Sequence, residues 1–442
     1  MIRTPTPAPR RGRRWLARSA FALAVVIAVG ASAAWWLGTR DDPMVAATTT
    51  NFDDADLIAR GAYVAKLGNC VTCHTAAGGA AYAGGRPVPT PFGTFYGPNI
   101  TPDPQTGIGH WSADDFWRAL HNGKAPDGRL LYPAFPYPEY TQVTRADADA
   151  LYAYLRTVPA VSQTSRENTL RFPYDQPLAL AAWRALFFRP GVYTPEPGQD
   201  ETWNRGAYLV NGLTHCAACH TPRNGWGASR GDAALAGGTI PILDWYAPPL
   251  TGNRPNGLGD WHADDIAALL RTGVSARGTA AGPMAEVVFQ SLQHLTANDA
   301  AAMAQYLKSL PASPAADRVD ASGAGRGTGA GGLMTHGAKV YEAHCLDCHG
   351  ANGEGKTPAY PPLAGNLSVL APSTANAIRV VLNGGFAPGT AGNPQPYGMP
   401  PFRQSLSDND VAAVVTYIRG SWGNDAPGVA PPDVRRYRAI AR

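Results

Sequence analysis

The stretch Cys70-Val71-Thr72-Cys73-His74 occurs in two further versions, Cys216-Ala217-Ala218-Cys219-His220 and Cys345-Leu346-Asp347-Cys348-His349. Each has the form C-x-x-C-H, which is the attachment pattern of c-type haem. Two thiols at this spacing suit the two vinyl groups of one porphyrin, and the adjacent imidazole then lies beneath the ring as the proximal iron ligand. We therefore predict three haem c groups, bound covalently through the six cysteines and ligated by His74, His220 and His349.

Two other interpretations of a C-x-x-C pair are half of a zinc site and a redox-active dithiol. A structural zinc ion needs four ligands from neighbouring segments, whereas these motifs are widely separated in the sequence. All six cysteines of the chain belong to the three motifs, so none remains for a separate disulfide framework. Covalent haem attachment is the interpretation that accounts for every cysteine.

Length and composition indicate several small helical units. The 442 residues predict two to four domains. Charged residues make up 16%, and the chain contains 49 glycines and 40 prolines, which favours short helices joined by irregular loops. The net charge of +4 is smaller than the positive charge of the six arginines that precede residue 19, so we expect no nucleic-acid partner.

Residues 1–50 are predicted to form an arginine-rich cytoplasmic tip and a transmembrane anchor. The uncharged run from Ser19 to Gly38 is long enough to cross a bilayer as a helix. The preceding arginines place the N-terminus in the cytoplasm, with Trp35 and Trp36 at the far interface. The alternative is a cleaved signal peptide with Ala31-Ser32-Ala33 as its cleavage site. Either interpretation places the remainder of the chain outside the cytoplasm.

Three repeats follow, which predicts one fold used three times. The first two haem motifs are preceded by Arg60-Gly61-Ala62-Tyr63 and Arg205-Gly206-Ala207-Tyr208, and the third by His336-Gly337-Ala338. Thr144, Thr296 and Ser407 each stand three residues before an aspartate, as at a helix start. We expect a mainly α-helical chain of three tandem class I-like cytochrome c domains behind one transmembrane helix. The domains cover residues 51–160, 197–312 and 333–425.

Further internal similarities mark a third shared helix and a shared turn. Residues 107–115 match residues 257–265, and the sequence from Pro248 to Asn253 resembles that from Pro361 to Asn366. The prolines and glycines of this turn predict a rigid loop that lies against a haem edge.

The connecting segments differ in character. Residues 161–196 contain Trp183, Phe187 and Phe188 and are expected to pack against a domain. Residues 313–332 are rich in Ala, Gly and Ser, which predicts a flexible tether and a mobile third domain. Residues 426–442 form a basic, Pro-rich tail that we expect to be solvated and disordered, with contact to lipid head groups or a partner as the alternative.

A haem that only transfers electrons usually takes a second axial ligand, and methionine is common in this role. Met399 in the third repeat and Met284 in the second precede the last helix of their repeats and are the predicted sixth ligands. Met303 is assigned to the core and Met334 is a poor candidate.

The first repeat contains no methionine. The position that corresponds to Met284 falls at about Ala134 or Phe135, and phenylalanine cannot ligate iron. We expect an open or weakly ligated first haem. His110 and His121, which we expect to face solvent, are the alternative ligands.

These residues resemble a known family, the membrane-associated triple-haem cytochrome c subunits of bacterial periplasmic dehydrogenases. The resemblance covers about residues 50–425. It rests on residues 99–103, 106–109, 131–137, 219–224, 282–284 and 421–424, which read NITPD, TGIG, LYPAFPY, CHTPRN, GPM and SWGN.

The resemblance implies an electron-transfer subunit in the bacterial inner membrane with its haem domains in the periplasm. Such a subunit takes electrons from a separate catalytic subunit (a quinoprotein alcohol dehydrogenase, a flavoprotein sugar-acid dehydrogenase or a molybdenum hydroxylase) and passes them to ubiquinone or another carrier. The alcohol branch typically has Met where this chain has Phe135, so this chain looks more similar to the partners of molybdenum hydroxylases.

In this interpretation the substrate chemistry belongs to the partner, and no residue of this chain is catalytic. Two alternatives are a stand-alone electron carrier to a terminal oxidase and a peroxidase-like haem enzyme that uses the open first haem.

Overall fold

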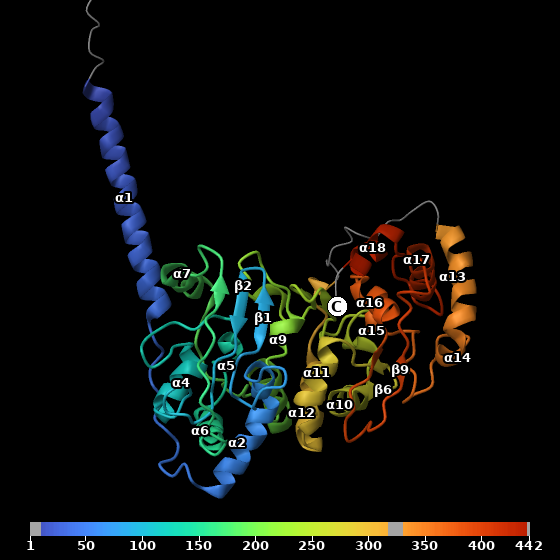
Figure 1. The fold of residues 1–442 in the computed structure, drawn as a ribbon, viewed down its shortest axis with the longest axis horizontal. Helices are drawn as coiled ribbons and strands as arrows, with labels where there is room; N and C mark the ends of the chain where they lie inside the picture. The colour runs from blue at the N-terminus through green and yellow to red at the C-terminus, as the bar shows by residue number, and fades with distance from the viewer. Residues whose placement is uncertain (1–9, 317–329, 440–442) are drawn as a thin grey trace, which may run out of the picture.

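The computed structural model describes residues 10–316 and 330–439 (Figure 1). One long helix, α1 (Arg10–Thr39), extends from a mainly helical body. Its apolar part, Trp15–Thr39, is long and apolar enough to cross a membrane. Residues 1–9 of the predicted cytoplasmic tip, and most of the predicted tether, lie outside the described residues.

The first repeat contains the helices α2 (Ala55–Leu67), α3 (Cys70–Cys73), α4 (Ala113–Asn122), α5 (Tyr137–Tyr140) and α6 (Arg145–Leu155). A hairpin of β1 (Pro87–Thr90) and β2 (Gly93–Tyr96) is extended by β3 (Thr169–Leu170). Helix α7 (Pro177–Phe187) follows in the connecting segment, which packs against the first repeat as expected.

The second repeat keeps the order of the main helices and adds several short elements. Its helices are α8 (Glu201–Tyr208), the π-helix η1 (Leu209–Leu213), α9 (Ala217–His220), α10 (Ala263–Thr272), α11 (Pro283–Gln290) and α12 (Ala297–Ser309), with short turns η2 (Gly231–Ala233), η3 (Leu258–Asp260) and η4 (Leu292–His294). Its hairpins are β4 (Gly238–Ile240) with β5 (Trp245–Ala247) and β6 (Val274–Ser275) with β7 (Gly278–Thr279).

The third repeat contains α13 (Ala330–His344), α14 (Leu346–His349), α15 (Leu367–Leu370), α16 (Ala375–Asn383) and α17 (Asp408–Arg419), with β8 (Gly385–Phe386) paired to β9 (Gly398–Met399). Helix α18 (Pro431–Ala439) ends the described chain.

In each repeat the helix before the haem motif crosses the last helix at a glycine. A side chain on Gly61, Gly206 or Gly337 would overlap the carbonyl oxygen of an alanine on the opposite helix. The crossings join α2 to α6, α8 to α12 and α13 to α17, and only glycine allows the two backbones to approach so closely. The glycine of the R-G-A-Y and H-G-A sequences therefore allows the close packing of the two helices that support each motif.

The predicted helix starts are confirmed. The hydroxyls of Thr144, Thr296 and Ser407 accept hydrogen bonds from the backbone N–H groups of the aspartates three residues later, at 3.2, 3.1 and 3.2 Å. Met303 is fully buried in α12, in agreement with its assignment to the core.

The first and second repeats share one hydrophobic core and two reciprocal polar contacts. The Tyr63 hydroxyl donates to Asp299 at 2.7 Å, and the Tyr208 hydroxyl donates to Asp147 at 2.5 Å. Each aspartate also binds the arginine of its own repeat, Arg205 or Arg60. The tyrosine of each R-G-A-Y sequence thus reaches across to the other repeat, while the arginine of that sequence stays within its own.

We expect the double variant Tyr63→Phe, Tyr208→Phe to loosen this junction. A hydrogen bond to a charged group contributes about 1.5–3 kcal/mol, so the first two repeats should unfold several degrees lower in calorimetry. The matched control is Tyr397→Phe, which removes a hydroxyl from a ring that is 60% exposed. Equal midpoints for the double variant and the control would contradict the role of the crossed contacts.

The third repeat has a separate core, but it also packs on the second repeat. The Asn376 side chain accepts from the Tyr246 N–H at 2.9 Å and donates to the Tyr246 carbonyl at 2.7 Å. Thr390 donates to the Thr272 carbonyl at 3.0 Å. These contacts run against the expectation of a mobile third domain, because they fix α16 beside β5.

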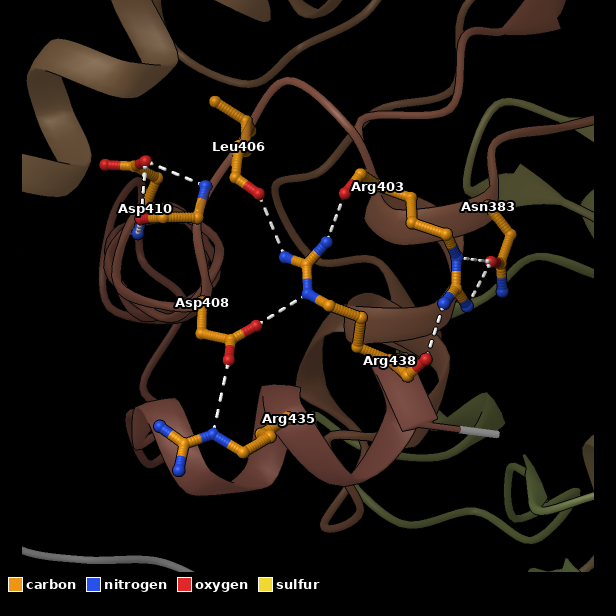
Figure 2. A network of polar contacts seen from close by, with 8 residues as sticks. Asn383, Arg403, Leu406, Asp408, Asp410, Arg435 and Arg438 are labelled. Carbon is orange, nitrogen blue, oxygen red and sulfur yellow. Dashed lines mark hydrogen bonds and ion pairs between the residues drawn. The ribbon is translucent and has the colours of Figure 1, made fainter. Parts of the chain in front are cut away.

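The expectation of a disordered C-terminal tail is wrong. Residues 431–439 form α18, whose Val434 and Tyr437 are buried against the third repeat. Figure 2 shows how polar contacts hold this helix: Arg438 pairs with Asp408 at 2.6 Å and donates to the carbonyls of Leu406 and Arg403. The spacing of the tail did not indicate these contacts, which join segments about thirty residues apart.

Candidate functional site

Each C-x-x-C-H motif lies on a single helical turn immediately after a longer helix. The turns are α3, α9 and α14, and they follow α2, η1 and α13. Left-handed backbone at Asn69 (φ 52°) and His215 (φ 40°) separates the turn from the helix in the first two repeats. The chain changes direction at these two residues. In all three repeats, the first cysteine of the motif (Cys70, Cys216 or Cys345) packs against an apolar cluster.

The motif histidines are held in one common way. The Nδ1 atoms of His74, His220 and His349 bond the carbonyl oxygens of Pro98, Pro248 and Pro361, at 2.7, 2.7 and 3.0 Å. A carbonyl can only accept, so Nδ1 carries the proton in each ring. This contact leaves the unprotonated Nε2 of each ring as the atom able to bind iron.

The shared proline turns account for this arrangement. Pro248 and Pro361 are the first residues of the two similar turns found in the sequence, and Pro98 takes the same place in the first repeat. The turn was expected at a haem edge, and the structure shows that its first carbonyl orients the motif histidine. The repeated proline turn therefore indicated part of the site, although the sequence did not show that the motif histidine is its partner.

The electrostatic setting suits a neutral ligand. Burial lowers the pKa of His74, His220 and His349, so their rings remain unprotonated at neutral pH. No disulfide joins the six cysteines, all of which are described. Across residues 10–316 and 330–439, no three His, Cys, Asp or Glu side chains converge on a metal position. The residues present fit covalent haem c.

The two predicted methionine ligands lie in the apolar clusters that also contain the motif cysteines. Met284, in the first turn of α11, is half-buried in the apolar cluster that the first two repeats share, which contains both Cys70 and Cys216. Met399, in β9, is half-buried in the same cluster as Cys345. Both side chains are therefore within the apolar surroundings of a motif.

At the corresponding place in the first repeat stands Phe135. Its ring packs against Tyr140 at 5.5 Å between centroids and against Tyr137 at 6.5 Å. Tyr140 is buried, and its hydroxyl donates to the carbonyl of Gly68, two residues before the first motif, at 2.6 Å. The loop at this position of the first repeat thus carries aromatic rings in place of a thioether.

Of the two alternative ligands, His121 was predicted to face solvent, and this prediction is wrong. It is 1% exposed, stacks on Trp117, and bonds the Thr141 carbonyl through Nδ1 at 2.8 Å and Asp42 through Nε2 at 3.2 Å. Both nitrogens are occupied by structural contacts, which removes His121 as a haem ligand or an acid–base group. His110 is exposed, as expected.

The first and second motifs adjoin one another, which the sequence did not show. Ser291 of the second repeat donates to the carbonyl of Leu67 at 3.0 Å, and the ring of His215 lies 5.4 Å from that of Tyr140. Arg86 pairs with Glu286 at 2.8 Å across the same junction. The segments leading into both motifs therefore meet at the shared core.

Comparison with known proteins supplies the context for this site. The cytochrome c family model matches residues 58–159, 204–311 and 334–422, which contain the three motifs.

Three curated relatives illustrate the similarity. The chain is 41% identical over 403 residues to the alcohol dehydrogenase (quinone) cytochrome c subunit of Gluconobacter oxydans, covering 87% of this chain and 83% of the relative. It is 42% identical over 395 residues to the gluconate 2-dehydrogenase cytochrome c subunit of Pantoea cypripedii, covering 86% and 89%. It is 40% identical over 438 residues to one of the nicotinate dehydrogenase subunits of Pseudomonas putida, covering 95% of this chain and 35% of that protein.

Proposed function

The chain belongs to the cytochrome c family, and from that membership we propose that it is the electron-transfer subunit of a dehydrogenase complex. It takes electrons from a separate catalytic subunit and delivers them to ubiquinone or another carrier. The observation that carries this proposal is the threefold motif, in which each histidine is oriented by a proline carbonyl. Two relatives that cover 87% and 86% of this chain are cytochrome c subunits of dehydrogenases.

In this proposal the chain holds three haem c groups in three tandem domains. Each is attached through two thioethers and bound on one face by an imidazole. The attachment residues are Cys70, Cys73, Cys216, Cys219, Cys345 and Cys348, and the proximal ligands are His74, His220 and His349.

Bound haem c supplies an iron centre that accepts and releases one electron at a time. The residues of this chain set the conditions for that exchange. The proline carbonyl accepts the Nδ1 proton and thereby fixes the tautomer and the orientation of each histidine. Met284 and Met399 would complete the second and third sites with a thioether, which favours the reduced metal. Phe135 leaves the first site without such a ligand.

The shared core supports a short path between the first two sites. Leu67 and Gly68, which lead into the first motif, contact Ser291 and Tyr140, and Tyr140 contacts His215 beside the second motif. The third repeat is held on the second by Asn376. A relay through three fixed sites follows from these contacts.

The periplasmic location and the retained anchor are part of the same proposal. Helix α1 continues without a break through Ala31–Ala33 to Thr39. Its end is bound to the body by Arg184, which donates to the carbonyl of Gly38 at 2.8 Å. A segment built into the body in this way favours an anchor over a cleaved signal peptide.

The catalytic partner is a quinoprotein, a flavoprotein or a molybdenum hydroxylase. The identities of 41%, 42% and 40% to subunits of alcohol, gluconate and nicotinate dehydrogenases do not separate these classes. Phe135 favours the last. The peroxidase-like alternative has lost one of its two acid–base candidates, because His121 is occupied on both nitrogens.

We expect the tagged chain to copurify with a dehydrogenase catalytic subunit from the membranes of its own cells. Under anaerobic conditions, the substrate of that subunit should reduce the haems of the complex. The change in haem absorbance measures this reduction. Ethanol, gluconate and nicotinate are the three substrates to test first, and the separated chain serves as the control. Purification of the chain alone, or turnover of peroxide by it, would contradict a subunit role.

A further inference from the structure

Helix α7 buries its charged residue and exposes apolar residues, which is the reverse of the pattern of a water-exposed helix. Arg184 is its only charged residue and is 2% exposed, whereas Leu186 is 67% and Leu178 is 44% exposed. The guanidinium group points inward, donating to the carbonyls of Gly38 and Asn122 at 2.8 and 2.7 Å. The outward face of α7 is therefore entirely apolar.

This face continues beyond α7 into neighbouring loops. Phe172, just before the helix, is 80% exposed, and Trp226 of the second repeat is 64% exposed. Trp183 of α7 donates its indole N–H to the Trp226 carbonyl at 2.9 Å, so these segments adjoin. We call Phe172, Leu178, Trp183, Leu186, Phe187 and Trp226 the α7 face.

The end of α1 determines where this face lies relative to a membrane. Gly38 contacts Ala181 of α7 so closely that a side chain would overlap the Ala181 carbonyl. Lys124 donates to the Thr39 carbonyl and pairs with Asp41 at 2.6 Å. The last turn of α1 is thus fixed to the body without a flexible joint.

The apolar span of α1 ends at Thr39, and Trp35 and Trp36 mark the level at which a bilayer would give way to water. Helix α7 packs on α1 at this same level, and Figure 1 shows it beside the end of α1 where the helix meets the body. Helix α18 lies on the same side of the body in Figure 1, and it exposes Arg435 and Arg436, which suit anionic head groups.

We propose that the α7 face lies in the head-group region of the membrane that α1 crosses, as an interfacial helix lies in the plane of a bilayer. The body is thereby held against the lipid surface at two places, not suspended from α1. This inference rests on the proposed retention of α1 and is independent of electron transfer.

The position of α7 gives this contact a consequence for the first haem site. Arg184 and Phe188 pack on Tyr137, which adjoins Phe135. Leu180 and Ala181 pack with Leu130 and Tyr132. The loop that contains Phe135, the residue aligned with Met284, therefore rests directly on the inner side of α7.

Photolabelling of the full-length holoprotein tests the proposal. The protein is reconstituted in phosphatidylcholine–phosphatidylglycerol vesicles that contain a diazirine lipid, and adducts are located by mass spectrometry of tryptic peptides. We expect adducts in residues 19–40 of α1, and also in residues 172–184, 185–205 and 224–230. Residues 61–66 of α2, at the far end of the first repeat in Figure 1, should remain unlabelled. Adducts confined to residues 19–40 would overturn the proposal.

A triple variant with Phe172, Leu178 and Leu186 each replaced by serine provides the second measurement. Labelling of residues 172–184 should fall roughly tenfold, because large apolar groups drive interfacial burial. The matched control is Phe386→Ser, which changes an equally apolar ring that is 71% exposed in β8 of the third repeat. Equal labelling in the triple variant and the control would overturn the proposal. Absence of residues 19–40 from the mature chain would overturn the anchor proposal and this one together, whereas adducts confined to residues 19–40 overturn this one alone.

Discussion

Replacing Cys216 and Cys219 together by alanine should lower the covalent haem content from three groups per chain to two. The two thiols are the only ones in the second repeat, so no other residue there can form a thioether. The pyridine haemochrome absorbance per chain measures the loss directly. The same double replacement at Cys70 and Cys73, or at Cys345 and Cys348, should remove one haem each.

The control for this experiment is Ala217→Ser, Ala218→Ser, which changes the two residues between the cysteines and keeps both thiols. Because loss of a haem can also prevent folding, the intact mass of the secreted chain provides an independent count of attached groups. Two or fewer haems in the unaltered chain, or an unchanged count after removal of one cysteine pair, would end the three-haem interpretation.

Phe135→Met should convert the first haem site from an open or weakly ligated state to a low-spin His/Met state. In the unaltered chain, low-temperature EPR should show two His/Met haems and one distinct haem, because Met284 and Met399 precede the last helix of the second and third repeats and the first repeat contains no methionine. Phe135 occupies the corresponding loop and packs on Tyr140 in the core that contains Cys70. A methionine there can bring a thioether to the same place.

The matched control is Phe135→Leu, which shortens the ring without offering a ligand and should leave the distinct signal in place. The potential of the first haem should rise in the methionine variant and not in the leucine variant. Three equivalent His/Met signals in the unaltered chain would show that another residue completes the first site.

Much of the fold follows from local sequence signals. The three motifs, the helix starts at Thr144, Thr296 and Ser407, and the repeated proline turn each lie within a few residues, so their physical meaning does not depend on the rest of the chain. The methionines before the last helix of the second and third repeats are equally local. These signals located the motifs and their surroundings before any contact was known.

Contacts between distant residues were not predictable in the same way. We expected His121 to face solvent, yet it is buried, because it bonds Asp42 and stacks on Trp117. Arg184 is buried inside an apolar helix because the end of α1 supplies a carbonyl partner. Periodicity and spacing carry no information about such partners, which depend on how the repeats assemble.

The crossed contacts between the first two repeats have the form of an isologous interface, in which residue i of one copy meets residue j of the other and the reverse. Tyr63 meets Asp299 as Tyr208 meets Asp147, and each aspartate is the counterpart of the other. Each of the first two repeats therefore supplies both halves of this contact, a tyrosine donor and an aspartate acceptor. The third repeat has Lys339 at the tyrosine position and therefore lacks the hydroxyl that makes this contact, and it meets the second repeat through Asn376 instead.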